Sequence, residues 1–187
     1  PALNTPEKKY PGVVMFHGGG WIRTSKSTMS TFYNRYLAHG FVVCNAEYRL
    51  ADNTGQFTPE FAPAPAAVQD ALLAAKWFYD HADEYNVDKN RIVVTGASAG
   101  GHLALMVGMC NDEKLGPVAG KDFKIAAIVN GYGCVDVPAL MAKQRPTDFA
   151  YQWIPDGPNR AELAKQMSPM TYVRKDIPPL ITVIGER

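Results

Sequence analysis

The feature that most constrains this chain is a serine in a glycine- and alanine-rich turn between an apolar run and a helix-forming run. Residues 96–100 read Gly-Ala-Ser-Ala-Gly, which places Ser98 at the centre of a G-x-S-x-G pentad. The β-branched residues 92–94 precede the pentad, and residues 102–107 have helix-forming composition. Small neighbours are required where a strand meets a helix across so sharp a turn. The pattern predicts a strained, nucleophilic Ser98 at a helix N-terminus, where negative charge is favoured.

A glycine run about 80 residues upstream supplies a second signal. Residues 12–16 read as a buried strand and lead directly into His-Gly-Gly-Gly-Trp at residues 17–21. Consecutive glycines let backbone N–H groups point into a pocket, so we expect Gly19, Gly20 and Ala99 to donate to an oxyanion. A phosphate-binding loop is the alternative for this run. Neither Gly-Lys-Ser/Thr nor G-x-G-x-x-G occurs here, which argues against nucleotide binding.

Together the two motifs resemble the α/β-hydrolase superfamily, in its esterase and lipase branch with hormone-sensitive lipase and bacterial acetyl esterases. Residues 96–104 are most similar to the subgroup of carbohydrate-deacetylating and feruloyl-type esterases. The resemblance implies a three-layer α/β fold with a mostly parallel sheet and helices on both faces. It implies a serine carboxylic-ester hydrolase that forms an acyl-enzyme and needs no metal or organic cofactor. The expected substrates are small or short-chain esters, including acetyl or aryl esters of carbohydrates.

Apolar runs alternate with helix-forming stretches, which is typical of a parallel sheet covered on both faces. The helix over residues 65–84 is expected to bury its Trp-Phe-Tyr cluster at 77–79, and residues 86–91 are expected to form a polar loop. Strands are expected at 12–16, 41–46, 92–94, 125–129 and 180–184, and further helices at 27–39, after Ser98, and at 161–166.

Three further groups of residues have expected roles around the site. Tyr132 follows a predicted strand at the end of the sheet where Ser98 lies. We expect Tyr132, together with Gly18 and Trp21, to line the pocket. Tyr48 and Arg49 are interpreted as packing and ion-pair residues rather than substrate contacts. The proline-rich residues 137–170 lie where the resembled superfamily carries a pocket-shaping cap, although a plain surface excursion fits the sequence equally well.

A serine hydroxyl needs a general base, normally a histidine oriented by a carboxylate. In α/β-hydrolases the order along the chain is serine, acid, histidine, and only His102 follows Ser98. His102 lies one turn further along the same helix, whereas the serine of such a turn points away from its own helix. We therefore expect a packed, hydrogen-bonded role for His102. The other histidines are His17, His39 and His81.

The resemblance implies a catalytic aspartate in the loop after residues 180–184, in a Gly-x-x-Asp arrangement. The sequence ends at Gly185-Glu186-Arg187, one residue short of that position. We therefore expect both acid and base beyond Arg187, with Glu186 and Asp136 as alternative acids. Residues 1–187 are then one partial hydrolase domain, truncated at both ends, and this fragment alone is expected to be inactive.

Composition argues against nucleic-acid binding, membrane association, a disulfide framework and a zinc site. The 187 residues carry 19 basic and 18 acidic side chains, which gives no electrostatic reason to expect a nucleic acid or membrane surface as partner. No apolar run approaches the ~20 residues of a membrane span. Three widely spaced cysteines without C-x-x-C argue against a disulfide framework or a zinc site.

The sequence leaves several alternatives open. A serine peptidase of the same fold is an enzymatic alternative. A non-catalytic ligand-binding protein, which keeps the serine but lacks the histidine, is the alternative from another class. Soluble cytoplasmic and secreted locations fit equally, and so do a monomer and a homo-oligomer.

Overall fold

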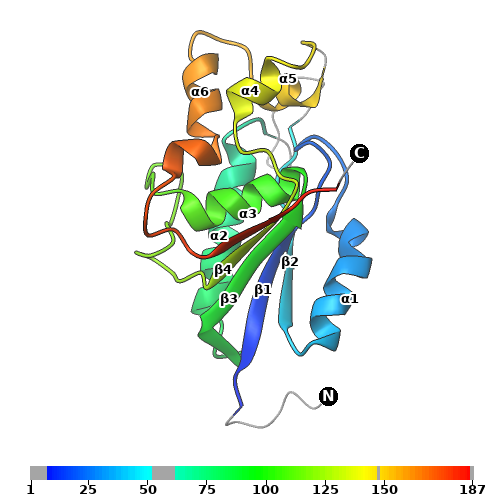
Figure 1. The fold of residues 1–187 in the computed structure, drawn as a ribbon, viewed down its shortest axis with the longest axis vertical. Coiled ribbons are helices and arrows are strands. Elements are labelled where there is room, and N and C mark those ends of the chain that lie inside the picture. The colour runs from blue at the N-terminus through cyan, green and yellow to red at the C-terminus, as the bar shows by residue number, and fades with distance from the viewer. Residues whose placement is uncertain (1–7, 52–61, 147, 186–187) are drawn as a thin grey trace.

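A computed structural model describes residues 8–51, 62–146 and 148–185 of the chain. Its centre is a five-stranded sheet in the order β2-β1-β3-β4-β5, and every neighbouring pair is parallel (Figure 1). The strands are β1 (Tyr10–Phe16), β2 (Val42–Ala46), β3 (Val87–Ala97), β4 (Ala127–Gly131) and β5 (Leu180–Val183).

Helices cover both faces of this sheet, so the expected α/β class is confirmed. On one face lie α2 (Ala66–Asp80) and α3 (Ala99–Met109), and on the other α1 (Ser30–Ala38) packs beside β2 (Figure 1). Three short helices gather above the carboxyl ends of the strands. They are α4 (Val137–Met141), α5 (Phe149–Trp153) and α6 (Arg160–Gln166); the 3-10 turns are η1 (Lys26–Met29) and η2 (Pro169–Tyr172).

The central strands read as continuous apolar runs because both of their faces are buried. In β1, Val13 and Met15 belong to the core under α1, whereas Val14 and Phe16 belong to the larger core under α2 and α3. All four side chains are at most 1% exposed. Burial of this kind contributes roughly 1.5–3 kcal/mol for each large side chain.

Two sequence expectations about the α2–β3 region are wrong in detail. Of the expected loop 86–91, residues 87–91 are a strand instead, because Val87 pairs with Tyr10 of β1 and β3 begins there. Trp77 is not part of the core, since it is 46% exposed and stacks on His81. On α2 the buried stripe instead passes through Phe78, one residue and about 100° further round the helix.

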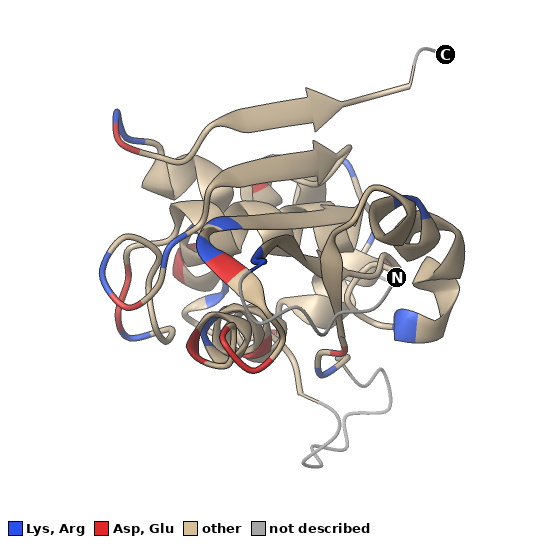
Figure 2. Cartoon of the chain, turned by 90° about the horizontal axis from the view of Figure 1, so that it is seen from below, with Lys and Arg blue, Asp and Glu red and all other residues tan. Residues whose placement is uncertain are grey.

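Positively and negatively charged residues follow one another along the chain at the amino ends of the strands (Figure 2). Asp83 is shared by Lys9 and Lys89, and Asp88 pairs with Arg91 at 2.9 Å. Within the described ranges, no helix combines the length and the apolar character that crossing a bilayer requires.

Glycines bring the turn between β3 and α3 against β1. A Cβ on Gly96 would lie 2.5 Å from the Phe16 carbonyl oxygen, and one on Gly100 would meet the same oxygen even more closely. Real Cβ atoms essentially never approach another atom within 3.0 Å. Every residue of α3 is buried, so the helix has no free side toward which it could shift.

Gly100→Ala is therefore expected to lower the free energy of unfolding by about 3 kcal/mol or more, because a buried backbone carbonyl cannot move aside. Urea denaturation followed by circular dichroism measures this loss. Gly185→Ala is the matched control, since nothing lies within 4 Å of that Cβ, and its change should stay within about 0.5 kcal/mol. Similar losses in both variants would contradict this account of the turn.

Candidate active site

Ser98 occupies the turn between β3 and α3 in a backbone conformation that few side chains adopt. Its φ and ψ are 55° and −121°, a strain that costs on the order of 1–3 kcal/mol. Two backbone hydrogen bonds hold it there. Its N–H donates to the Gly131 carbonyl at 2.8 Å, and its own carbonyl accepts from the His102 N–H at 3.0 Å.

The glycine loop after β1 lies directly beside this serine. A Cβ on Gly18 would stand 3.6 Å from the Ser98 Cβ. Gly19 and Gly20 have φ values of +114° and +63°, so the loop bends sharply back, and Ile22 and Arg23 donate to the Gly19 carbonyl at 3.2 Å.

The N–H groups of Gly19, Gly20 and Ala99 make no hydrogen bond to any residue that the structure describes. Ala99 is the first residue of α3, where N–H groups have no partner within the helix and the helix dipole is positive. Three uncommitted donors thus belong to the two segments that meet at Ser98. Such donors can stabilise an oxygen that becomes negative during a reaction.

A layer of side chains supports the glycine loop from below. The His17 ring stacks on Tyr48 with centroids 4.2 Å apart, and its Nε2 lies 2.6 Å from a Glu47 carboxylate oxygen. The Tyr48 hydroxyl donates to the His17 carbonyl at 2.9 Å. Arg49 forms a bidentate pair with Asp70, with its closest contacts at 2.8 Å. The interpretation of Tyr48 and Arg49 as packing and ion-pair residues is confirmed.

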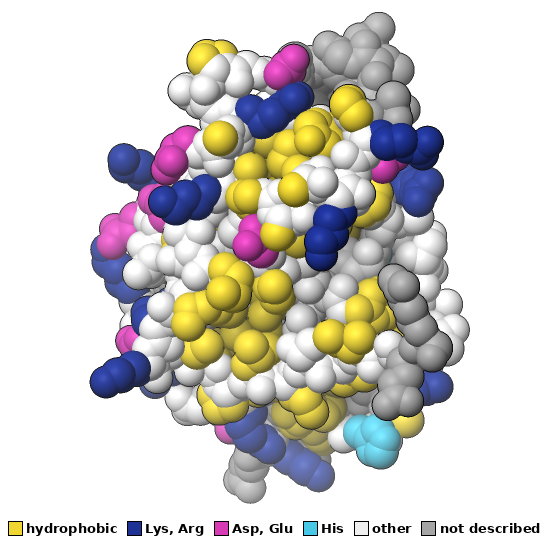
Figure 3. Space-filling view, turned by 45° about the horizontal axis from the view of Figure 1, so that its top comes forward, with side chains coloured by type: hydrophobic (Ala, Val, Ile, Leu, Met, Phe, Trp, Pro, Cys, Tyr) yellow, Lys and Arg dark blue, Asp and Glu magenta, His cyan; other side chains and the backbone are white. Residues whose placement is uncertain are grey.

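A cavity of about 260 Å³ opens at Ser98. Of the residues expected in the pocket, Trp21 and Tyr132 line it and Gly18 does not. Leu140 of α4 and Phe149 of α5 also lie in its wall. Phe149 packs against the glycine loop, since a Cβ on Gly20 would lie 2.9 Å from the Phe149 Cβ. Figure 3 brings this end of the molecule forward and shows hydrophobic side chains gathered within a rim of charged ones.

The sequence analysis assigned neither Phe149 nor Leu140 to the pocket. The only signal was their position within residues 137–170, which we expected to shape the pocket. Hydrogen bonds join the two ends of that segment: the Ser168 hydroxyl accepts from the Val137 N–H at 2.9 Å, and the Met170 N–H donates to the Val135 carbonyl. The two ends of this segment therefore lie side by side, and the residues between them cover Ser98.

Neither Cys134 nor a second, larger hollow supplies a nucleophile beside Ser98. Burial raises the pKa of the Cys134 thiol to about 11, so this pocket side chain is uncharged at neutral pH. A larger hollow of about 720 Å³ lies at the far end of α3, bordered by Gly108, Lys124 and Pro178, and Ser98 does not line it.

His102 is wholly buried and its two ring nitrogens are both engaged. Nδ1 accepts a hydrogen bond from the Trp21 indole at 3.2 Å, and Nε2 lies 2.7 Å from the Met167 carbonyl oxygen. Burial lowers the pKa of His102 to about 4, against the smaller opposing effect of the Met167 carbonyl. With both nitrogens occupied, His102 is not placed to take the proton of Ser98.

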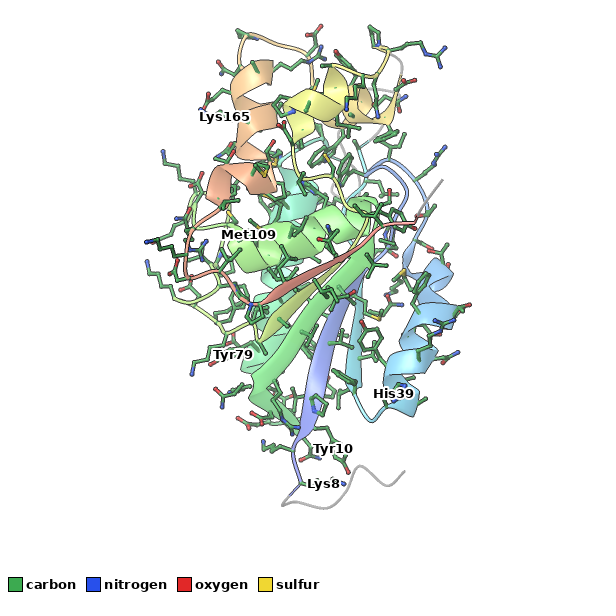
Figure 4. The ribbon with its side chains drawn as sticks, in the orientation of Figure 1. Lys8, Tyr10, His39, Tyr79, Met109 and Lys165 are labelled. Carbon is green, nitrogen blue, oxygen red and sulfur yellow. The ribbon has the colours of Figure 1, made fainter. Side chains whose placement is uncertain are left out.

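The remaining histidines are no closer to this chemistry. His17 is held by Glu47, and His81 bonds the Trp77 carbonyl at 2.8 Å on the outer side of the molecule. His39 follows α1 toward the end of the sheet where Tyr10 begins β1, away from the carboxyl ends of the strands (Figure 4).

The structure describes only one of the two alternative acids, Asp136 and Glu186. Asp136 caps α4 by accepting from the Ala139 N–H at 3.0 Å, which assigns it a structural role. Glu186 lies outside the described residues. Ser98 itself makes no hydrogen bond through its hydroxyl to any part of the chain that the structure describes.

The parallel sheet and the serine-bearing turn from β3 into α3 together define an α/β-hydrolase, as the resemblance implied. Residues 3–187 match the BD-FAE family, and the chain belongs to that family.

Several proteins similar to this chain are esterases. The Mycobacterium tuberculosis esterase LipC is 27% identical over 190 residues, which cover 97% of this chain and 45% of LipC. A thermophilic esterase of Thermogutta terrifontis, Est2 with bound propionate, superimposes with a TM-score of 0.74 at 25% identity, covering 97% of this chain and 63% of that one. A truncated carbohydrate esterase from gut microbiota gives 0.77 at 25% identity, covering 94% and 66%. The chain thus spans less than half the length of LipC.

The lowered pKa of His102 predicts a pH-dependent stability. Because the unfolded chain binds this proton near pH 6.5 and the native state only near pH 4, native stability is lost as pH falls through that window. Between pH 7 and 4.5 the wild-type chain should lose about 2 to 3 kcal/mol more than His102→Asn, which cannot titrate there. Urea denaturation at several pH values measures both curves, and parallel curves would contradict a buried neutral imidazole.

Proposed function

We propose that this chain carries the nucleophile and the oxyanion hole of a serine carboxylic-ester hydrolase. One observation carries the proposal: Ser98 stands in a strained turn beside three uncommitted N–H donors, those of Gly19, Gly20 and Ala99. This arrangement favours attack on a carbonyl carbon, because the donors stabilise the oxygen that becomes negative.

The reaction follows from this geometry. The Ser98 oxygen attacks the ester carbonyl carbon and the carbonyl π electrons move onto the oxygen, which the three N–H groups bind. The tetrahedral intermediate collapses and expels the alcohol, which takes up a proton and leaves an acyl-enzyme on Ser98. Water then attacks the acyl-enzyme by the same route, releasing the acid and restoring the serine.

Both steps need a group that removes and returns a proton. We propose that this base, and the acid that orients it, come from residues outside 1–187. All four histidines lie in the described ranges, and none of them is placed to reach Ser98. The incomplete coverage of the relatives' lengths supports the same view.

For the substrate we propose an ester with a short acyl group. The cavity at Ser98 holds only about 260 Å³, and Phe149 closes it against Gly20. We assign residues 137–170 the role of a cap that shapes this pocket. The propionate bound by Est2 supports a short acyl group, and the similarity to a carbohydrate esterase supports an ester of a carbohydrate.

In the full-length protein that contains these residues, we expect p-nitrophenyl acetate to be hydrolysed with an initial burst. Ser98→Ala should lower kcat on the order of 10⁶-fold, because it removes the nucleophile. Ser30→Ala, an exposed serine on α1, is the control and should leave kcat unchanged. Activity that survives Ser98→Ala would refute the assignment.

Residues 1–187 alone test the origin of the base in the same assay. They should not exceed the residual 10³–10⁴-fold acceleration that an oxyanion hole provides without a triad. Equal kcat/KM for the short and full-length chains would place the base inside this sequence. A full-length protein that binds esters without hydrolysing them would favour the non-catalytic alternative, and preferential cleavage of a peptide anilide would favour a peptidase.

Phe149→Ala should lengthen the acyl group that the site accepts. We expect kcat/KM for p-nitrophenyl hexanoate, relative to the acetate, to rise about tenfold because the removed ring opens the cavity beyond Gly20. Phe32→Ala is the matched control, since Phe32 is 49% exposed on α1 and does not line this cavity. An unchanged ratio would show that Phe149 does not limit the acyl group.

A further inference from the structure

We propose that His102 is a positioning residue: its uncharged ring ties the glycine loop to the nucleophile helix and so fixes the spacing of the oxyanion donors. The inference rests on the proposed esterase function. It assigns a task to a histidine that the proposed chemistry otherwise leaves unused.

The partners of the His102 ring determine where its proton lies. The Trp21 indole nitrogen is a donor only, so Nδ1 of His102 must accept at 3.2 Å. The Met167 carbonyl is an acceptor only, so Nε2 must carry the hydrogen that it donates at 2.7 Å. One neutral tautomer satisfies both partners. A ring that lacks either function leaves a buried polar group without a partner, which is costly.

The Trp21 bond joins the two halves of the proposed oxyanion hole. Trp21 directly follows Gly20 in the loop, and His102 lies on α3 one turn after Ala99. Trp21 is 1% exposed and His102 is 0% exposed, so the bond is screened from water. Because donors of the loop and of the helix must reach one oxygen together, their separation depends on this cross-link.

Aromatic rings surround this cross-link. Trp21 stacks on Trp153 of α5 with centroids 4.0 Å apart and planes 14° from parallel. The His102 ring lies nearly perpendicular to both indoles, with centroids 4.9 and 5.2 Å from theirs. Met167, whose carbonyl receives the other bond, immediately follows α6. The same ring therefore also anchors residues 137–170 above the serine.

The cross-link should affect the transition state more than substrate binding. A ground-state carbonyl oxygen draws little on the N–H donors, whereas the oxyanion depends on their positions. Loosening the loop should therefore lower kcat and leave KM nearly unchanged. It should also act on oxygen esters more than on thionoesters, because sulfur is larger and a weaker acceptor and gains less from donors placed for oxygen.

The experiment compares four variants of the full-length protein on p-nitrophenyl acetate and on its thiono analogue. Trp21→Phe removes the indole donor and keeps an aromatic ring, while His102→Leu removes both hydrogen bonds. His102→Asn keeps an acceptor near the position of Nδ1 and tests rescue. Trp153→Phe is the matched control for the lost indole volume, since the Trp153 nitrogen, also buried, has no hydrogen-bond partner in the described part of the chain.

We expect Trp21→Phe and His102→Leu each to lower kcat for the oxygen ester about 10²-fold, with KM within threefold and a clearly smaller loss for the thionoester. His102→Asn should recover at least tenfold of the kcat that His102→Leu loses, and Trp153→Phe should stay within threefold of wild type. The double variant Trp21→Phe/His102→Leu should be no worse than His102→Leu alone, because His102→Leu already removes the bond that Trp21→Phe removes.

Equal losses for the oxygen ester and the thionoester, or additive losses in the double variant, would overturn the inference. So would an equal fall of kcat in Trp153→Phe, since that would assign the effect to packing alone. If His102→Leu does not fold, the comparison of Trp21→Phe with Trp153→Phe tests the inference, with the same kcat measurements on the two esters. An inactive wild-type protein would instead refute the proposed function.

Discussion

The structure depends on a close contact between the turn after β3 and the end of β1. Gly96 and Gly100 both meet the Phe16 carbonyl oxygen, at distances where no side chain fits. This contact lets α3 start immediately above the sheet, which puts Ser98 at the helix N-terminus and the glycine loop after Phe16 beside it. The packing of the sheet and helix, together with the two backbone hydrogen bonds of Ser98, compensates for the strain at that residue.

Histidines in this chain serve structure in different ways. His17 supports the glycine loop through its stack on Tyr48 and its contact with Glu47, while His102 is wholly buried between Trp21 and Met167. A histidine whose two nitrogens are engaged in this way cannot also remove a proton from a hydroxyl. The hydrogen-bond partners of a histidine ring, rather than the position of that histidine in the sequence, decide whether it can act as a base.

Much of the fold follows from local patterns. The alternation of strands and helices was predictable because continuous β-branched runs and helical periodicity are properties of short windows. Errors arose where a neighbour decided the outcome. Residues 87–91 belong to β3 because Tyr10 pairs with Val87, and Trp77 faces outward because the buried stripe of α2 runs through Phe78. The sequence of a polar stretch does not reveal whether a strand pairs with it, and the sequence of an aromatic cluster does not reveal which of its rings faces the core.

The sequence by itself determined the serine turn and the glycine loop, since both need small residues at fixed spacing for steric reasons. Only the tertiary structure decided what surrounds them. His102 meets Trp21 from 81 residues away and Met167 from 65, and Phe149 closes the cavity against Gly20. Such contacts depend on how whole elements pack, and no local spacing encodes which distant side chain arrives. For that reason the serine turn was predictable before the fold, whereas the partners of the His102 ring and the contribution of Phe149 to the pocket wall were not.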